Sequence, residues 1–274
     1  MKRRRDARSG SDDHNARGIE LADRGWLEEA ASEFNKAIKL DSSSSQAHDN
    51  LGTVYAEQGK LYEALECFQK ALQAEPESPA AHHYLASFLA ASGQDLAISC
   101  YRRAIELEYE FPDAHLNLGL ALAERGQLEE AVLELQLAHE QEPEDELIEH
   151  ELAACLIEME RYPDAIGHLK AIVRSHPEHV EAHVDLGLAY SAQGFYAEAE
   201  AALQRALEID GADFVAHYHI AGLYSTWQRP LDGLRHLELA AAQDQERVRD
   251  WLKDDRMFDG LRAEARFKAV LGKL

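Results

Sequence analysis

Residues 47–76 read AHDNLGTVYAEQGKLYEALECFQKALQAEP, and the same pattern returns along the chain. Gly52 aligns with Gly119, and Gly126 with Gly194, at two 34-residue periods, with one residue missing between the first pair. A fixed period of this length is the sequence signature of an architecture in which each repeat packs on its neighbours. The period divides the chain into seven repeats, at residues 11–44, 45–78, 79–111, 112–145, 146–179, 180–213 and 214–247.

Three positions within the repeat keep their size in all seven copies. Position 8 is always small: Gly18, Gly52, Ala86, Gly119, Ala153, Gly187 and Ala221. Position 20 is small as well: Ala30, Ala64, Ala97, Ala131, Ala165, Ala199 and Gly233. Position 24 is bulky: Phe34, Phe68, Tyr101, Leu135, Leu169, Leu203 and Leu237. Small residues on two helices let the backbones approach while bulky neighbours fill the remaining space. Each repeat is therefore predicted to be two closely packed helices, helix A and helix B.

The predicted turns carry residues that end and begin helices. A glycine follows helix A in five repeats: Gly25, Gly59, Gly93, Gly126 and Gly194. Glycine is favoured just past a helix end because it adopts a left-handed backbone without strain. Repeats 5 and 7 have Glu160 and Gln228 there, and use Pro163 and Pro230 near the start of helix B, where a missing N–H costs little. The fold class is predicted to be all-α.

Three segments of repeat 2 resemble the tetratricopeptide consensus: residues 47–55, 59–64 and 68–72, closed by Pro76. Residues 182–207 repeat the resemblance. It implies a right-handed α-solenoid, that is, a superhelix of about seven helix pairs, that binds other proteins and is not an enzyme. The resemblance is specific for the fold and does not identify a partner.

The two ends of the chain lie outside the repeats. Residues 248–274 are similar to a tail that closes bacterial arrays of this family, and carry Trp251, Phe258, Leu261, Phe267 and Leu271. Because an end repeat exposes an apolar face, these side chains are suited to cover it. We expect residues 248–274 to form a C-terminal cap and residues 1–10 to be a basic disordered tail.

The charge of the chain limits its partners. The 274 residues carry a net charge of -23, and the acidic excess lies between two basic ends. Such a field repels phosphate backbones, so nucleic acid is excluded and a basic or mixed-charge protein segment is favoured. No run approaches the roughly 18 apolar residues of a membrane helix, and no apolar signal-peptide core follows the basic start. The three cysteines lack a Cys-x-x-Cys pair, which favours a reducing, cytoplasmic location.

The sequence lacks the spacings typical of catalytic and cofactor sites. It has neither a Gly-x-x-x-x-Gly-Lys-Ser/Thr loop nor a Gly-x-Ser-x-Gly turn, so we expect no enzymatic activity and no cofactor. Six of its 14 histidines follow the repeat at position 4: His14, His48, His82, His115, His183 and His217. His176, His179 and His183 have a tempting spacing, but they are divided between a connector and the next helix, so no metal site is expected.

In this family helix A lines a concave groove, with positions 2, 5, 6, 9, 12 and 13 facing the ligand. Transferring these positions gives the candidate protein-binding residues Asp49, Asn50, Glu57, His83, Tyr84, Leu116, Asn117, Leu120, Glu124, His150, Glu151, Glu158, Val184, Asp185, Leu188, Tyr218 and His219. None is Lys or Arg, which excludes the chaperone-binding type that holds a terminal carboxylate with groove cations.

Two features of this candidate groove suggest how a peptide is held. Asn50 and Asn117 match asparagines that bond a peptide backbone in arrays of the O-GlcNAc-transferase type. The apolar strip consists of Leu116, Leu120, Val184 and Leu188, which either contact a ligand or pack on the neighbouring helix. We interpret the chain as a non-enzymatic adaptor for a basic or mixed-charge protein segment. The alternatives are a self-assembling scaffold and a targeting subunit of a separate catalytic chain.

Overall fold

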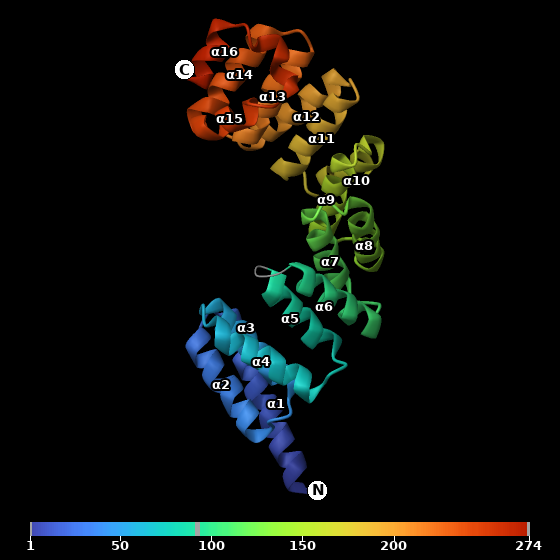
Figure 1. Ribbon diagram of the computed structural model, residues 1–274, viewed down its shortest axis with the longest axis vertical. Coiled ribbons are helices and arrows are strands. Elements are labelled where there is room, and N and C mark those ends of the chain that lie inside the picture. The colour runs from blue at the N-terminus through green and yellow to red at the C-terminus, as the bar shows by residue number, and fades with distance from the viewer. Residues whose placement is uncertain (1, 91–93, 273–274) are drawn as a thin grey trace. The chain divides into compact units, whose positions relative to one another are not determined.

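The computed structural model describes residues 2–90 and 94–272, and every regular element in these ranges is a helix (Figure 1). The all-α prediction is therefore confirmed. The first eight helices are α1 (Lys2–Asp23), α2 (Leu27–Leu40), α3 (Ser45–Glu57), α4 (Leu61–Ala74), α5 (Pro79–Ala90), α6 (Gln94–Leu107), α7 (Pro112–Glu124) and α8 (Leu128–Gln141). The next six are α9 (Glu146–Glu158), α10 (Tyr162–Ser175), α11 (Val180–Ala192), α12 (Tyr196–Ile209), α13 (Phe214–Thr226) and α14 (Pro230–Gln243). Each repeat contains one pair, with the odd-numbered helix as helix A.

The chain divides into two compact units, Met1–Pro143 and Glu144–Leu274. The first, here the N-terminal unit, holds α1 to α8. The second, the C-terminal unit, holds α9 to α14 and three short closing elements: α15 (Gln245–Leu252), the 3-10 helix η1 (Arg256–Leu261) and α16 (Ala265–Leu271). No helix among the described residues combines the length and apolar character needed to cross a membrane.

Close contact between helix A and helix B explains the small residues at position 8. A Cβ atom added to Gly52 would lie 2.8 Å from the Phe68 ring, and one added to Gly119 would lie 2.7 Å from Leu135. Both distances are shorter than van der Waals contact, so a side chain at either glycine would force the helices apart. Positions 8 and 24 therefore pack on each other, as predicted.

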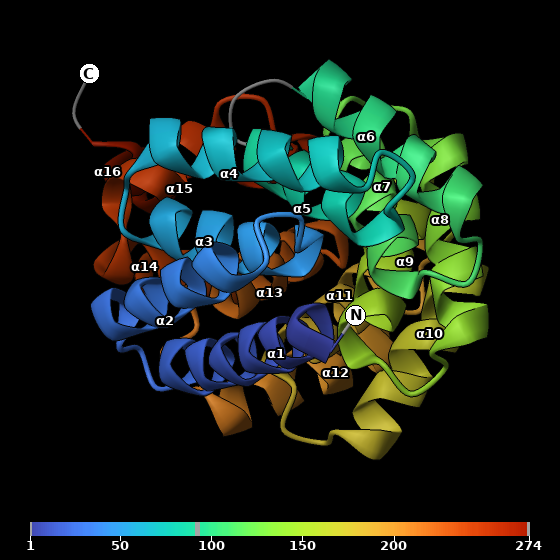
Figure 2. The ribbon, with the colours of Figure 1, turned by 90° about the horizontal axis from the view of Figure 1, so that it is seen from below.

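Within each unit the A helices form one layer. α3 contacts both α1 and α5, and α5 contacts α7, while α11 contacts both α9 and α13. The B helices have no comparable contact with one another in the described ranges. Figure 2 shows α1 to α4 lying side by side as consecutive hairpins. Because the more closely spaced layer lies on the inside of a bend, the A helices line the concave side of each unit.

The N-terminus differs from the sequence expectation. α1 begins at Lys2, so the segment 1–10, expected to be a disordered tail, is helical from residue 2. Residues 2–8 contain Lys, Arg, Ala and Asp but no Gly or Pro, and Lys, Arg and Ala are strong helix formers. The helix of repeat 1 therefore extends toward the N-terminus.

Repeat 1 also presents a polar outer face. Positions 3 and 7 hold Ala47 and Leu51 in repeat 2, and both side chains are buried against repeat 1. The same positions in repeat 1 hold Asp13 and Arg17, which are exposed. A charged face does not stack on another repeat without losing hydration, which is how a terminal repeat stays soluble.

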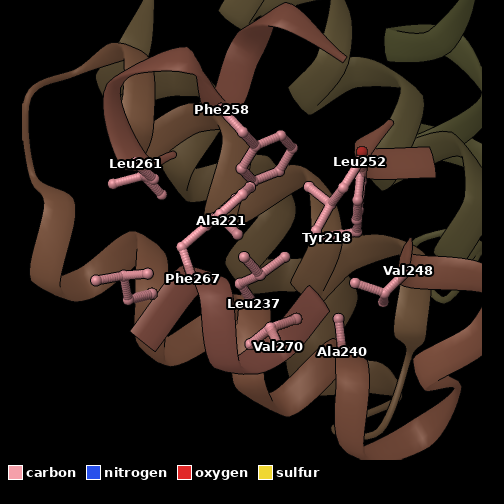
Figure 3. Close-up of a cluster of buried hydrophobic side chains, with 11 residues drawn as sticks. Tyr218, Ala221, Leu237, Ala240, Val248, Leu252, Phe258, Leu261, Phe267 and Val270 are labelled. Carbon is pink, nitrogen blue, oxygen red and sulfur yellow. The ribbon is translucent and has the colours of Figure 1, made fainter. Parts of the chain in front are cut away.

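The C-terminal segment covers the other end of the stack. Phe258, Leu261 and Phe267 are fully buried in one cluster with Leu237 and Tyr218 of repeat 7 (Figure 3). Trp251 and Leu271 pack against the same cluster. The five side chains that the sequence assigned to a cap therefore lie on the apolar face of the last repeat.

Two turns hold non-glycine residues in a left-handed conformation. Glu160 and Gln228 have φ of 57° and 59°, close to the 72° of Gly126 at the equivalent turn. Pro163 and Pro230 lie in the first turn of helix B, as predicted. Gly93, assigned the same role in repeat 3, lies outside the described residues. Repeats 5 and 7 therefore keep the turn geometry without the residue that suits it.

This geometry yields a stability prediction. Glu160→Gly and Gln228→Gly are each expected to raise the free energy of unfolding by about 0.5 to 1 kcal/mol, because glycine relieves the cost of a left-handed backbone at exposed positions. Urea unfolding monitored by circular dichroism measures the change. The control is Glu158→Gly in the last turn of α9, which should destabilise the protein because it adds backbone freedom to a helix. Equal effects of all three substitutions would contradict the prediction.

Candidate functional site

The inner face is defined here as the surface of helix A in repeats 2 to 7, that is α3, α5 and α7 in one unit and α9, α11 and α13 in the other. These six helices contain no Lys or Arg. They carry ten carboxylates: Asp49, Glu57, Asp113, Glu124, Glu146, Glu149, Glu151, Glu158, Glu181 and Asp185. In the N-terminal unit α1, helix A of repeat 1, does carry Lys and Arg. The acidic surface is therefore that of α3 and α7 in this unit and of α9 and α11 in the other.

The predicted groove residues differ widely in exposure. The exposed ones are Glu57, Tyr84, Glu124 and Glu158. The half-buried ones are Asn50, His83, Asn117, Leu120, His150, Glu151, Asp185, Leu188 and His219. The buried ones are Asp49, Leu116, Val184 and Tyr218. The first two groups remain accessible to a partner, and the third does not.

All four buried residues occupy position 5, where the sequence expectation needs correction. Tyr218 shows what a buried side chain at this position contacts: its hydroxyl donates to Asp255 at 2.8 Å and its ring packs on Phe258. Leu116 and Val184 are 8% and 5% exposed, so the expected apolar strip consists largely of packing residues. Leu120 and Leu188 are the members that keep partial exposure.

Asp49 is an unusual member of this buried set. Its side chain is 2% exposed, and Oδ1 has no hydrogen-bond partner among the described residues. Burial, together with the charge of Glu75, raises the pKa of the Asp49 carboxyl to about 7. Asp49 is therefore partly neutral near pH 7 and contributes less than a full charge to the field of the inner face.

Polar side chains of the inner face also join neighbouring repeats. Asn50 Nδ2 donates to Asn15 Oδ1 at 3.0 Å, which connects α3 to α1. His150 Nε2 lies 3.0 Å from Asp185 Oδ2, which connects α9 to α11. The hydrogen bond to Asp185 outweighs the burial of the ring and raises the pKa of His150. These side chains therefore stabilise the contact between neighbouring repeats. Their positions within a single repeat did not predict this role.

The two asparagines expected to bond a peptide differ from each other. Asn117 Nδ2 donates at 2.8 Å to the backbone carbonyl of Asp113, one turn earlier in α7. Asn50 uses its amide on Asn15. Each keeps its side-chain oxygen as an acceptor for a backbone N–H, so a peptide would meet two isolated amides rather than a continuous ladder.

The position-4 histidines fasten the connectors between repeats. Their Nε2 atoms lie within hydrogen-bond distance of the carbonyl six residues earlier: Ser42 for His48, Pro76 for His82, Tyr109 for His115 and Pro177 for His183. A carbonyl only accepts, so Nε2 donates in each case. The periodic histidines therefore have a structural role. The sequence pattern predicted their positions but not their hydrogen bonds.

The histidine trio does not converge on one point. His176 Nδ1 and His179 Nε2 lie 2.8 and 3.1 Å from the two carboxylate oxygens of Glu146. His183 Nε2 instead donates to the carbonyl of Pro177. Nδ1 of His179 accepts the backbone N–H of Ala182 and caps α11, so the ring must carry its proton on Nε2. The ring nitrogens therefore serve local hydrogen bonds.

The cysteines are buried thiols of low reactivity. Cys67, Cys100 and Cys155 are buried and unpaired. Burial raises the pKa of the Cys67 and Cys155 thiols to about 11, which leaves almost no thiolate at neutral pH.

Comparison with known families identifies the type of repeat. Residues 87–146 and 153–214 match a family model described as tetratricopeptide repeat, and residues 46–78 match a second model with that description. Residues 18–59 match a model described as TPR repeat. Together these segments span well over half of the chain. A search of curated proteins finds no match.

Solved structures of tetratricopeptide proteins resemble this chain. PilF of Pseudomonas aeruginosa is 18% identical with a TM-score of 0.63, and the match covers 78% of this chain and 99% of that one. The C-terminal part of a TPR repeat-containing protein from Cytophaga hutchinsonii is 18% identical with a TM-score of 0.66, covering 90% and 99%. A chain of the Cut9–Hcn1 hetero-tetramer of the APC/C is 24% identical with a TM-score of 0.63, and the match covers 86% of this chain and 47% of that one. Such likeness shows the fold alone, and the predicted all-α solenoid is confirmed.

Proposed function

The chain belongs to the tetratricopeptide-repeat family, whose members mediate protein–protein interactions, and we propose that it is a non-enzymatic adaptor whose inner face binds a basic or mixed-charge segment of another protein. The observation that carries the proposal is the absence of Lys and Arg from the six A helices, against ten carboxylates. An acidic concave surface attracts cationic segments and repels acidic ones.

The accessible groups support a mixed mode of binding. Glu57 and Glu158 are exposed on α3 and α9, and Glu151 is half-buried on α9. Tyr84 on α5 is 39% exposed, which offers an aromatic face beside the acidic surface. Charge then contributes attraction that salt screens, and the partly exposed Tyr84, Leu120 and Leu188 contribute contact that salt does not screen.

Stacking of copies end to end is less well supported than binding of a separate partner. The outer face of repeat 1 carries the exposed Asp13 and Arg17, and the cap buries the apolar face of repeat 7. Neither face offers the apolar surface that drives association of repeats. Self-association would have to use the sides of the units.

Charge reversal on the inner face tests the proposal. Glu151→Lys combined with Glu158→Lys should weaken binding of a fluorescein-labelled lysine–alanine peptide by about 1 to 3 kcal/mol, because it removes attraction and adds repulsion. Fluorescence anisotropy at low and high salt measures the affinity. Binding to the parent protein should weaken as salt rises.

The matched control reverses two exposed carboxylates of helix B in the same unit, Glu198→Lys with Glu208→Lys. Glu208 pairs with Arg205, but exposed pairs contribute little, so the fold should tolerate the change. The control changes net charge equally and should lower affinity much less. Equal losses in both variants, or preferential binding of a glutamate–alanine peptide, would mean that the inner face is not the binding surface.

A further inference from the structure

Two aromatic rings of the C-terminal unit enclose a side chain of the same chain. Phe214, the first residue of α13, and Trp251 in α15 have ring centroids 5.0 Å apart, inclined at 59°. The guanidinium carbon of Arg247 lies 5.0 Å from the Phe214 ring and 4.8 Å from the Trp251 ring. Both rings are partly buried and Arg247 is exposed. The two ring faces, which are inclined to each other and both lie beneath the guanidinium, are here called the aromatic cleft.

The wall of the aromatic cleft is rigid. The Trp251 ring meets the Tyr218 ring edge-on at 4.9 Å, and Tyr218 is fixed by its hydrogen bond to Asp255 and by Phe258 behind it. Tyr218 is 3% exposed, so it supports the cleft from within. The two cation-facing rings are therefore held in place by the cap rather than by Arg247.

Arg247 itself is weakly held. Its guanidinium has no ion pair among the described residues, and only its backbone N–H is bonded, to Asp244 at 2.9 Å. Arg229 provides the contrast in the same unit, because it lies over Tyr224 and Trp227 and is also paired at 2.9 Å with both Glu200 and Asp232. Arg229 is fixed on its rings by carboxylates, whereas Arg247 can leave its rings without breaking an ion pair.

We propose that the aromatic cleft of Phe214 and Trp251 is a binding site for an arginine or lysine side chain of a partner protein, and that Arg247 occupies it in the unbound chain. The inference rests on the proposed function, which supplies a basic partner. Aromatic faces attract cations through the ring quadrupole, and a guanidinium also stacks flat on a ring. When a partner's cation takes the rings, the exposed Arg247 side chain can extend into solvent, where its charge stays hydrated.

The site also lies where a groove ligand would reach it. Phe214 begins helix A of repeat 7, and Tyr218 follows one turn later on the same helix. The inner face of the C-terminal unit and the aromatic cleft therefore share helix α13. Sequence analysis missed the cleft because Phe214 and Trp251 come from a repeat and from the cap, and no periodicity connects them.

The test uses a short glycine–serine peptide with one arginine, and a copy with citrulline, which has the same shape without the charge. NMR follows the Trp251 indole N–H, assigned with Trp251→Phe, as peptide is added. The arginine peptide should shift this resonance and the citrulline peptide should not. Arg247→Ala should tighten arginine-peptide binding about two- to fivefold, because it removes the competing cation.

Two further variants separate binding from packing. Phe214→Leu keeps an apolar side chain but removes a ring, and should weaken binding about two- to fivefold. Arg229→Ala removes the ring-bound arginine that is paired, and should not tighten binding. Unchanged affinity in Arg247→Ala, or equal shifts with arginine and citrulline peptides, would overturn the inference.

The outcomes distinguish the cleft from the inner face. If the lysine–alanine peptide responds to reversal of Glu151 and Glu158 while no peptide moves the Trp251 resonance, the cleft inference fails and the proposed function stands. If the arginine peptide occupies the cleft while reversal of the two glutamates has no effect, the cleft stands and the acidic inner face is not the binding surface.

Discussion

Replacing Phe258 by alanine is expected to lower the free energy of unfolding of the C-terminal unit by about 3 to 5 kcal/mol. The ring is fully buried between repeat 7 and the cap, 5.0 Å from the Tyr218 ring and 6.3 Å from the Phe267 ring. Removing it leaves a cavity in the cluster that joins repeat 7 to the cap. Urea unfolding measured by circular dichroism gives the change, with Leu231→Ala, at an exposed site, as the control.

Deletion of residues 245–274 is the stronger form of the same experiment. It exposes the apolar face formed by Leu234, Leu237 and Tyr218, so the truncated chain should lose stability and self-associate through the uncovered surface. Light scattering across concentration detects the association. A truncated chain that stays monomeric with an unchanged melting temperature would show that the segment is not a cap.

The helix pairs could be predicted from the sequence because their cause lies within one repeat. Gly52 is small since the Phe68 ring occupies the space where its side chain would be, and both residues recur at fixed positions. The turns at Glu160 and Gln228 are different: they break the sequence rule but keep the geometry. Tertiary packing of the two helices fixes that turn, and the strain lies in the backbone of these two exposed residues.

The inner face could be predicted only in part, because its details depend on contacts between repeats. Position 5 was expected to face the ligand, but Leu116 is buried, and Val184 is buried in one cluster with Ala216 and Ile220 of the next repeat. The pairing of His150 with Asp185 likewise joins two repeats. A repeat aligned on its own periodicity shows which residues share a face, and the angle between neighbouring repeats then decides which of them stay accessible.

The charge of the groove was also predicted in part. The lack of Lys and Arg in helix A of repeats 2 to 7 is a property of sequence and carries over directly to the structure. The ionisation of each carboxylate cannot be predicted from the sequence in this way, because it depends on how deeply the side chain is buried. Asp49 and Asp113 lie on helices of the same layer, yet the first is buried and the second is exposed. Counting acidic residues therefore overstates the field that a partner meets.

Asp49 should make the stability of the protein depend on pH. Its folded pKa of about 7 lies above the unfolded value of 3.8. Between these values the unfolded chain has released the proton that the folded chain still holds, so the free energy of unfolding falls as pH rises from about 4 to about 7. It then stays level, because both states are ionised. The ionised carboxylate is then buried without compensation, at a cost of about 2 to 4 kcal/mol.

Asp49→Asn removes this ionisation while keeping the shape of the side chain. The variant should gain about 2 to 4 kcal/mol over the parent at pH 8 and less than half as much at pH 5. Urea unfolding at the two pH values measures both differences, and groups such as His150 that titrate in both proteins cancel in the comparison. The control is Asp113→Asn, at an exposed site of the same layer, which should change stability little at either pH. A gain for Asp49→Asn that is the same at pH 5 and pH 8 would show that Asp49 ionises normally in the folded chain, and the carboxylate would then count in full toward the charge that attracts a basic partner.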